Sequence, residues 1–397
     1  MAVLWDWSDL LVRWLHVIAG IAWIGSSFYF VHLDLSLKRR DDLPEGAHGE
    51  AWQVHGGGFY HMVKYLVAPA RMPDELTWFK WEAYATWLSG MVLLAIVYYI
   101  GYELYLVDHN VLALAPWQAI GLSLAGLAAG WVAYDLLCKS AIGRNQTMLL
   151  AIGFVFLVAL AYLFTQLLSA RGAFMQMGAL IGTIMVANVA MVIIPNQRKV
   201  VADLIAGRTP DPALGVQGKQ RSLHNNYLTL PVVFIMIGTH YPLAYATRYS
   251  WLMLGLVIVI GVAIRHFFNT RHRGEPSPWW AWGVAAAAAI GIIWLSTLGP
   301  VAGGRVEARP GILVAAEDAQ NIVIGRCSMC HGTEPAWDGI RVPPLAVVLD
   351  TPERVEARAH QIAAASVWSN AMPPGNITEM TLDERQMLAT WLAAKGL

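Results

Sequence analysis

The sequence predicts an all-α protein, a polytopic membrane helix bundle of about eight spans followed by a small soluble domain. Of its 397 residues, 57% are hydrophobic and only 14% are charged, which is too apolar for an ordinary soluble protein of this length. Apolar runs of about 20 residues, the length that crosses a ~30 Å hydrocarbon core, recur along most of the chain. After Pro300 the sequence becomes more charged, and glycines and prolines form a short linker.

The apolar runs define the expected spans and the domain boundaries. The first run lacks a basic leader and a cleavage site, so we interpret it as an uncleaved membrane helix. We divide the chain into a membrane domain at 1–300, a linker at 301–311 and a soluble domain at 312–397. The loop at 32–81 is too long for a simple connector, and we expect it to cover the cytoplasmic face. The predicted spans are 10–31, 82–107, 117–137, 147–168, 173–194, 226–247, 250–268 and 279–298.

Basic residues concentrate in alternate loops, and positively charged loops stay in the cytoplasm. The second loop has no Lys or Arg, and the fourth and sixth have one each. We therefore expect a multi-pass protein of the bacterial inner membrane, with both termini and the soluble domain in the periplasm. Because 27 basic residues balance 27 acidic ones, no nucleic-acid partner is expected. The odd-numbered loops carry Lys38, Arg39, Arg40, Lys64, Arg71, Lys80, Lys139, Arg144, Arg198, Lys199, Arg208, Lys219, Arg221, Arg271 and Arg273.

The soluble domain contains a Cys-Xaa-Xaa-Cys-His motif. Cys327 and Cys330 have the spacing at which two thiols add to the vinyl groups of haem, and the adjacent His331 then becomes the proximal iron ligand. A zinc site is one alternative, but it would want two more ligands nearby. A redox dithiol is another, but it needs a βαβ context. The motif therefore predicts one covalent haem c.

A sixth iron ligand is expected from the far side of the haem. Met372 lies in an Ala-Met-Pro-Pro-Gly-Asn run and is well placed for it. The helix expected after Thr381 would pack over the haem with Met387, Leu388 and Trp391 on one face. A buried core methionine is the alternative for Met372. These features resemble class I cytochromes c over residues 312–397, and the resemblance assigns His331 and Met372 as axial ligands.

Polar side chains inside a bilayer are costly and often functional. His16 and His240 are expected at similar depth in the periplasmic half, where they could ligate a haem b. Each could instead hydrogen-bond to a carbonyl of a neighbouring helix, as we expect for Asn188. The Trp-Leu-His-Xaa6-Trp-Xaa-Gly stretch around His16 resembles the first helix of several bacterial haem-b membrane proteins, including the flavin-free type of protoporphyrinogen oxidase. That resemblance implies a haem ligand at His16.

Polar residues also gather at the expected cytoplasmic face. Amide and basic groups of this kind can hydrogen-bond a planar anionic heterocycle, although a solvated loop facing lipid headgroups is the alternative. Gly56 to Gly58 allow close backbone approach to a ligand, but they do not form a phosphate loop. The candidate catalytic residues are His55, His61, Lys64, Asn196, Gln197, Arg198, His224, Asn225 and Asn226.

Taken together, the Trp-Leu-His first span, the His-Gly-Gly-Gly-Phe-Tyr-His loop, the Leu-His-Asn-Asn-Tyr start of the sixth span and the fused cytochrome resemble one family. It is the bacterial membrane-bound urate oxidase, also called urate hydroxylase. The resemblance implies oxidation of urate to 5-hydroxyisourate, with electrons passing to the cytochrome c domain. A terminal cytochrome oxidase or a soluble cytochrome c would then accept them. Since urate catabolism is cytoplasmic, buried haem b, one or more, would be the relay across the membrane.

Two other functions fit the residues. One is a cytochrome anchor subunit that links quinol or a dehydrogenase to a terminal oxidase and has no substrate site of its own. The other is a haem-biosynthesis or metal-reducing enzyme that uses the His16 helix for different chemistry. The polar first and fifth loops favour a substrate site over a pure anchor.

Overall fold

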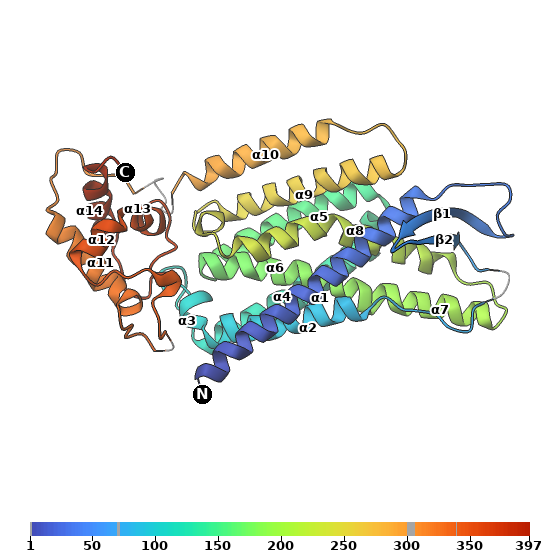
Figure 1. The fold of residues 1–397 in the computed structure, drawn as a ribbon, viewed down its shortest axis with the longest axis horizontal. Helices are drawn as coiled ribbons and strands as arrows, with labels where there is room; N and C mark the ends of the chain where they lie inside the picture. Colours follow the sequence, from blue (N-terminus) through green and yellow to red (C-terminus); the bar gives the residue numbers. More distant parts are fainter. Residues whose placement is uncertain (1, 70–71, 300–305, 339) are drawn as a thin grey trace.

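The computed structural model describes residues 2–69, 72–299, 306–338 and 340–397. It is mostly helical, which confirms the predicted class, and part of the expected 301–311 linker lies outside the described residues. Figure 1 shows an elongated bundle whose N-terminus and C-terminal domain lie at one end, with a β-hairpin and α7 at the other. The elements are α1 (Ala2–Ser36), β1 (Ala47–His55), β2 (Gly58–Tyr65), α2 (Trp81–Leu94), α3 (Tyr102–Tyr105), α4 (Pro116–Lys139), α5 (Gln146–Thr165), α6 (Ala170–Ala187), α7 (Ile194–Ile205), α8 (Pro212–Gly238), α9 (Ser250–His272), α10 (Trp280–Ser296), α11 (Ala316–His331), α12 (Pro352–Ala357), α13 (Ala359–Ile362) and α14 (Leu382–Ala393).

Each of the eight predicted spans overlaps a helix, although α8 begins 14 residues before the predicted span 226–247 and ends nine residues before the end of that span. Among the described residues, six helices are long and apolar enough to cross a membrane. The other two are α8, whose first half is polar, and α10, which has 17 residues. Eight crossings therefore remain a prediction. The six qualifying helices are Val3–Ser36, Trp81–Ile100, Pro116–Lys139, Gln146–Thr165, Ala170–Ile205 and Ser250–His272.

The expected polar loop after the fifth span is mostly helical. The helix that begins with α6 continues through α7 to Ile205, and α8 already starts at Pro212, so only a short turn joins them. A π-helical turn at Asn188–Ile193 precedes Pro195. Proline lacks the N–H that a regular helical turn needs, and a wide turn accommodates that loss. Asp211 caps α8 by accepting a hydrogen bond from the Ala213 N–H (2.9 Å).

The long first loop contains a β-hairpin that the sequence analysis missed. β1 and β2 pair antiparallel with His55 opposite Gly58. Gly56 and Gly57 form the turn with φ values of +58° and +80°, a left-handed conformation that a two-residue hairpin turn favours. These glycines, which suggested close approach to a ligand, thus shape the turn.

The membrane domain is built around α6. Leu180, Ile181 and Ile184 are 0% exposed. In the apolar 18-residue stretch of the α6–α7 helix, 67% is buried inside the bundle. In the apolar stretch of α1, only 6% is buried inside the bundle. Consequently α6 is the central helix, whereas α1 lies on the periphery and packs chiefly along α2.

The C-terminal domain has its own core, in which Val323, Val355 and Leu388 are fully buried. The expected helix after Thr381 is confirmed as α14, which Thr381 caps reciprocally with Glu384. The domain contacts the bundle through the segment that contains Met372. There the Asn370 N–H donates to the Ala246 carbonyl (3.4 Å).

Candidate functional site

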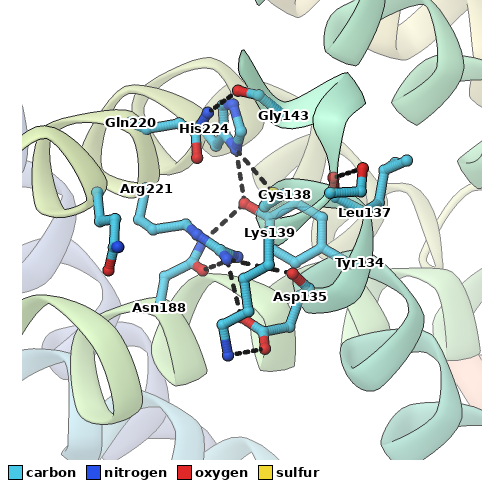
Figure 2. Close-up of polar contacts among 12 residues, drawn as sticks. Tyr134, Asp135, Leu137, Cys138, Lys139, Gly143, Asn188, Gln220, Arg221 and His224 are labelled. Carbon is cyan, nitrogen blue, oxygen red and sulfur yellow. Dashed lines mark hydrogen bonds and ion pairs between the residues drawn. The ribbon is translucent and has the colours of Figure 1, made fainter. Parts of the chain in front are cut away.

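A buried polar network joins α4, the π-helical turn and α8 (Figure 2). The Tyr134 hydroxyl lies 2.6 Å from Nδ1 of His224. Asn188 Nδ2 donates to the Tyr134 hydroxyl (3.1 Å) and to Asn225 Oδ1 (2.9 Å). This confirms the expectation that Asn188 bonds to other helices. Because Asn188 begins the π-helical turn, the irregular backbone helps to place its amide between α4 and α8.

An ion pair completes this network and balances its charge. Arg221, 2% exposed, donates from Nη2 to Asp135 Oδ1 (2.8 Å) and from Nη1 to Asn188 Oδ1 (3.3 Å). Its guanidinium also lies 5.0 Å from the centroid of the Tyr134 ring. Lys139 Nζ, nearer the surface, is 2.5 Å from the other carboxylate oxygen of Asp135. The buried Arg221 cation therefore has its counter-ion within the protein, as buried charges require.

A second buried polar group lies between α8, α9 and α1. Arg265 donates from Nε to Asn226 Oδ1 (3.3 Å) and from Nη2 to Asn269 Oδ1 (3.1 Å). Asn269 Nδ2 donates to the same Asn226 oxygen (2.9 Å). The Arg265 guanidinium lies 4.0 Å from the centroid of the Phe28 ring. Within the described part of the chain, Arg265 meets no carboxylate, and the buried Asn226 Nδ2 has no hydrogen-bond partner.

A small cavity separates α1 from α6 and α8 near these groups. Asn225, Thr229 and Ser27 line it together with apolar side chains, and its volume is about 10 Å³, room for about one water molecule. Asn225 thus borders the cavity while its side chain also donates to the Met185 carbonyl (2.9 Å). A water there would have polar partners on two helices.

The three candidates on the hairpin have local partners. His61 Nε2 lies 2.6 Å from Glu50 Oε2, and its ring stacks on Trp52 with centroids 4.2 Å apart. Lys64 Nζ pairs with Asp34 Oδ1 at 2.6 Å. His55 is exposed at the turn. No hydrogen bond among the described residues joins these side chains to the two buried groups.

The candidates on α7 are also separate from the buried groups. Asn196 Nδ2 donates to the Leu214 carbonyl (3.3 Å) and to Gln217 Oε1 (3.2 Å), and so ties α7 to the start of α8. Gln197 and Arg198 are exposed. Of the nine catalytic candidates, the structure therefore brings His224, Asn225 and Asn226 into buried polar groups and leaves the other six outside them. The roles of all nine remain predictions.

His16 lies in the first half of α1, against α2, and His240 follows the end of α8. Nδ1 of His16 contacts the Thr86 carbonyl (3.0 Å) and Ser89 Oγ (3.1 Å) on α2, which leaves Nε2 available. His240 is exposed just beyond α8, and Arg13 lies within electrostatic range of both histidines. A haem b held by these two histidines remains a prediction.

The Cys-Xaa-Xaa-Cys-His motif, which predicts haem c, occupies the end of α11. His331 Nδ1 lies 2.9 Å from the Val347 carbonyl, a contact that fixes the ring and leaves Nε2 for iron. Cys327 and Cys330 are free, and burial raises the pKa of the Cys327 thiol to about 12. Among the described residues there is no cluster of three or more His, Cys, Asp or Glu, so the zinc alternative gains no support.

The segment expected to bring the sixth ligand is held by a buried arginine. Arg385 donates to the carbonyls of Ser366 (2.6 Å) and Met372 (3.1 Å). It is 7% exposed and forms no ion pair with a carboxylate among the described residues. The carboxylates of Asp108 and Glu384 lie within electrostatic range of Arg385, and a haem propionate would supply a further anion. The buried Thr378 hydroxyl and Trp391 Nε1 also have no partner within the described residues. This donor set fits a haem c.

Several polar residues of the two buried groups were not predicted. Asp135 and Arg265 lie inside predicted spans, where a charge is itself a signal of function, so the sequence could have singled them out. Tyr134 and Asn269 carry no such signal, because an aromatic residue or an amide at a helix end is common. Their importance follows only from the tertiary packing, in which α9 lies against α8 and side chains join α4 to α8.

The comparisons place most of the chain in a known family. Residues 2–296 of the 397 match the model of the family described as Urate oxidase N-terminal, so the match spans α1 to α10. No curated protein and no solved structure matches the chain. Both buried polar groups lie within the matched region, and the Cys-Xaa-Xaa-Cys-His motif lies outside it. The chain therefore belongs to the urate oxidase N-terminal family.

Proposed function

We propose that this protein is a membrane-bound oxidoreductase that converts urate to 5-hydroxyisourate and passes the electrons to its own cytochrome c domain. Family membership supports the substrate. The observation that carries the electron route is the docking of the Met372 segment on the bundle. A Cβ built on Gly375 would lie 2.6 Å from the Val107 carbonyl, so this segment is in direct contact with the membrane domain.

The chemistry balances without oxygen as a reactant. Urate and one water give 5-hydroxyisourate, two protons and two electrons, and the new hydroxyl oxygen comes from water. Haem accepts one electron at a time, so the electrons leave in two steps. Hydrogen peroxide is then not a stoichiometric product. Buried amide and basic groups on α8 and α9 would hold and orient the substrate.

The geometry of the bundle supports a transmembrane electron path. The buried polar groups involve the middle of α8 and the end of α9, whereas His16 lies in the first half of α1 and His240 follows the end of α8. If the basic loops face the cytoplasm, electrons must cross most of a ~30 Å core. A haem b held by His16 and His240 would be the intermediate. A terminal cytochrome oxidase or a soluble cytochrome c in the periplasm would accept the electrons.

A cytochrome anchor without a substrate site is the alternative. An anchor needs histidines to bind haem. Haem binding alone does not explain why Arg265 is buried without a carboxylate partner among the described residues. Burying such groups costs free energy, which argues that they serve a ligand.

The test is anaerobic addition of urate to the purified full-length protein while haem c absorbance is followed. We expect urate to reduce haem c, and xanthine and hypoxanthine to leave it oxidised. A haem c that ascorbate reduces but urate does not would overturn the proposal. Equal reduction by all three purines would show that the electrons come from nonspecific contact.

A further inference from the structure

The two buried arginines near one end of the bundle differ in one respect. Arg221 is 2% exposed and pairs with Asp135, whereas Arg265 is 6% exposed and contacts only amide oxygens and an aromatic ring. A buried cation normally has an anionic partner, because desolvation without one is costly. Within the described residues, the protein supplies that partner to Arg221 and not to Arg265.

We infer that Arg265, Asn226 and Phe28 form the binding site of a planar anion, the urate monoanion if the proposed function is correct. We call it the Arg265 site. The guanidinium lies over the face of Phe28 at 4.0 Å, so the ring fixes its orientation. A guanidinium held in this way offers a fork of N–H donors that matches two adjacent acceptors of a planar anion.

The helix register brings further unsatisfied groups to this site. Phe28 and His32 are four residues apart and lie on one face of α1. Arg265, Asn269 and His272 are four and three residues apart and lie on one face of α9. His32 and His272 meet with ring centroids 4.5 Å apart. Asn226 Nδ2 and His272 Nδ1 are both buried without a hydrogen-bond partner among the described residues. Unsatisfied buried donors and acceptors are rare unless a ligand or water completes them.

An anionic purine has the groups that this site lacks. Its carbonyl oxygens and deprotonated nitrogen would accept from Arg265 and from the Asn226 amide, and its remaining N–H groups would donate to a neutral histidine. The neighbouring cavity of about 10 Å³ holds only about one water, so the wall must move to admit a purine. Because α1 lies on the periphery of the bundle, a displacement of α1 would open the Arg265 site without disturbing the central helix α6.

The experiment measures binding apart from turnover. Full-length protein is reduced with dithionite, so that no oxidised haem is available, and radiolabelled urate is added in equilibrium dialysis. We expect Arg265→Gln to weaken urate binding by about 10- to 100-fold, as loss of charge-assisted hydrogen bonds implies. Arg265→Lys should lie between, because lysine keeps the charge but not the fork. Arg271→Gln, an exposed position on the same helix, is the control and should bind normally.

A second variant distinguishes a loss of urate binding from a loss of folding. Asn226→Asp places a carboxylate beside the Arg265 guanidinium and supplies the missing anion from within. It should abolish urate binding without lowering the midpoint of thermal unfolding. Unchanged affinity in Arg265→Gln or Asn226→Asp, or no urate binding by the wild type, overturns the Arg265 site. Binding that depends on Arg265 in a protein whose haem c urate never reduces would sustain the site and reject the proposed oxidation.

Discussion

The Arg221–Asp135 pair makes a quantitative prediction about stability. Asp135→Asn keeps the size of the side chain but removes the counter-ion of Arg221, a residue that is 2% exposed. Removing one partner of a buried ion pair costs about 3–5 kcal/mol. The Asp135 side chain is 15% exposed, and Arg221 keeps a hydrogen bond to Asn188, so we expect the lower end, about 3 kcal/mol. That corresponds to a factor of about 100 or more in the unfolding equilibrium.

Lys139→Met provides the matched control. Lys139 contacts the same carboxylate, but its side chain is 65% exposed, and exposed ion pairs contribute about 0–1 kcal/mol. Unfolding of the solubilised protein with increasing SDS, followed by tryptophan fluorescence, measures both variants. The double variant Arg221→Met with Asp135→Leu should recover much of the lost stability. Equal losses in Asp135→Asn and Lys139→Met, or a loss below about 1 kcal/mol in Asp135→Asn, would refute the reasoning.

Three further predictions concern the cytochrome domain and its contact with the bundle. Cys327→Ala should weaken or abolish the haem stain of denatured protein on a gel, and full retention of that stain would contradict covalent attachment. Met372→His should lower the potential of haem c strongly in a redox titration, because a thioether ligand favours ferrous iron, and an unchanged potential would mean that another residue is the ligand. Gly375→Val should slow urate-driven reduction of haem c, because its Cβ would meet the Val107 carbonyl. Gly396→Ala, at a similar positive φ with nothing within 4 Å, is the control, and equal rates in the two variants would exclude a docking role.

The sequence predicted the helices well because each apolar run is long and its boundaries are set by local chemistry. The helix after Thr381 is an example, since its capping box is written in the sequence. The hairpin was missed because apolar and polar residues alternate only weakly along its strands. Each strand also carries a polar residue, Glu50 on β1 and His61 on β2, and these two side chains pair with each other. The continuation of α6 into α7 was missed because Pro195 and the polar residues after it suggested the end of a span.

The candidate site was predictable only in part. Residues on α8 stood out as a polar run at the start of a span, and two of them, Asn225 and Asn226, prove to be buried. The sequence could not show that Asn225 belongs to the network around Asn188 whereas Asn226 belongs to the group around Arg265. The difference arises because α6 packs on one side of α8 and α9 packs on the other. Likewise the partners of His61 and Lys64 are fixed by the hairpin register and by α1. A motif identifies residue types, but only the fold decides which of them meet.

The measurement that tests the account most directly is an electron count in the absence of oxygen. Purified protein is mixed with excess oxidised soluble cytochrome c and a limiting amount of urate, and both urate consumption and total haem c reduction are recorded. We expect urate to be consumed without oxygen and two haem c equivalents to be reduced for each urate. Consumption that stops when oxygen is removed, with hydrogen peroxide formed in proportion to urate once oxygen is restored, would contradict it.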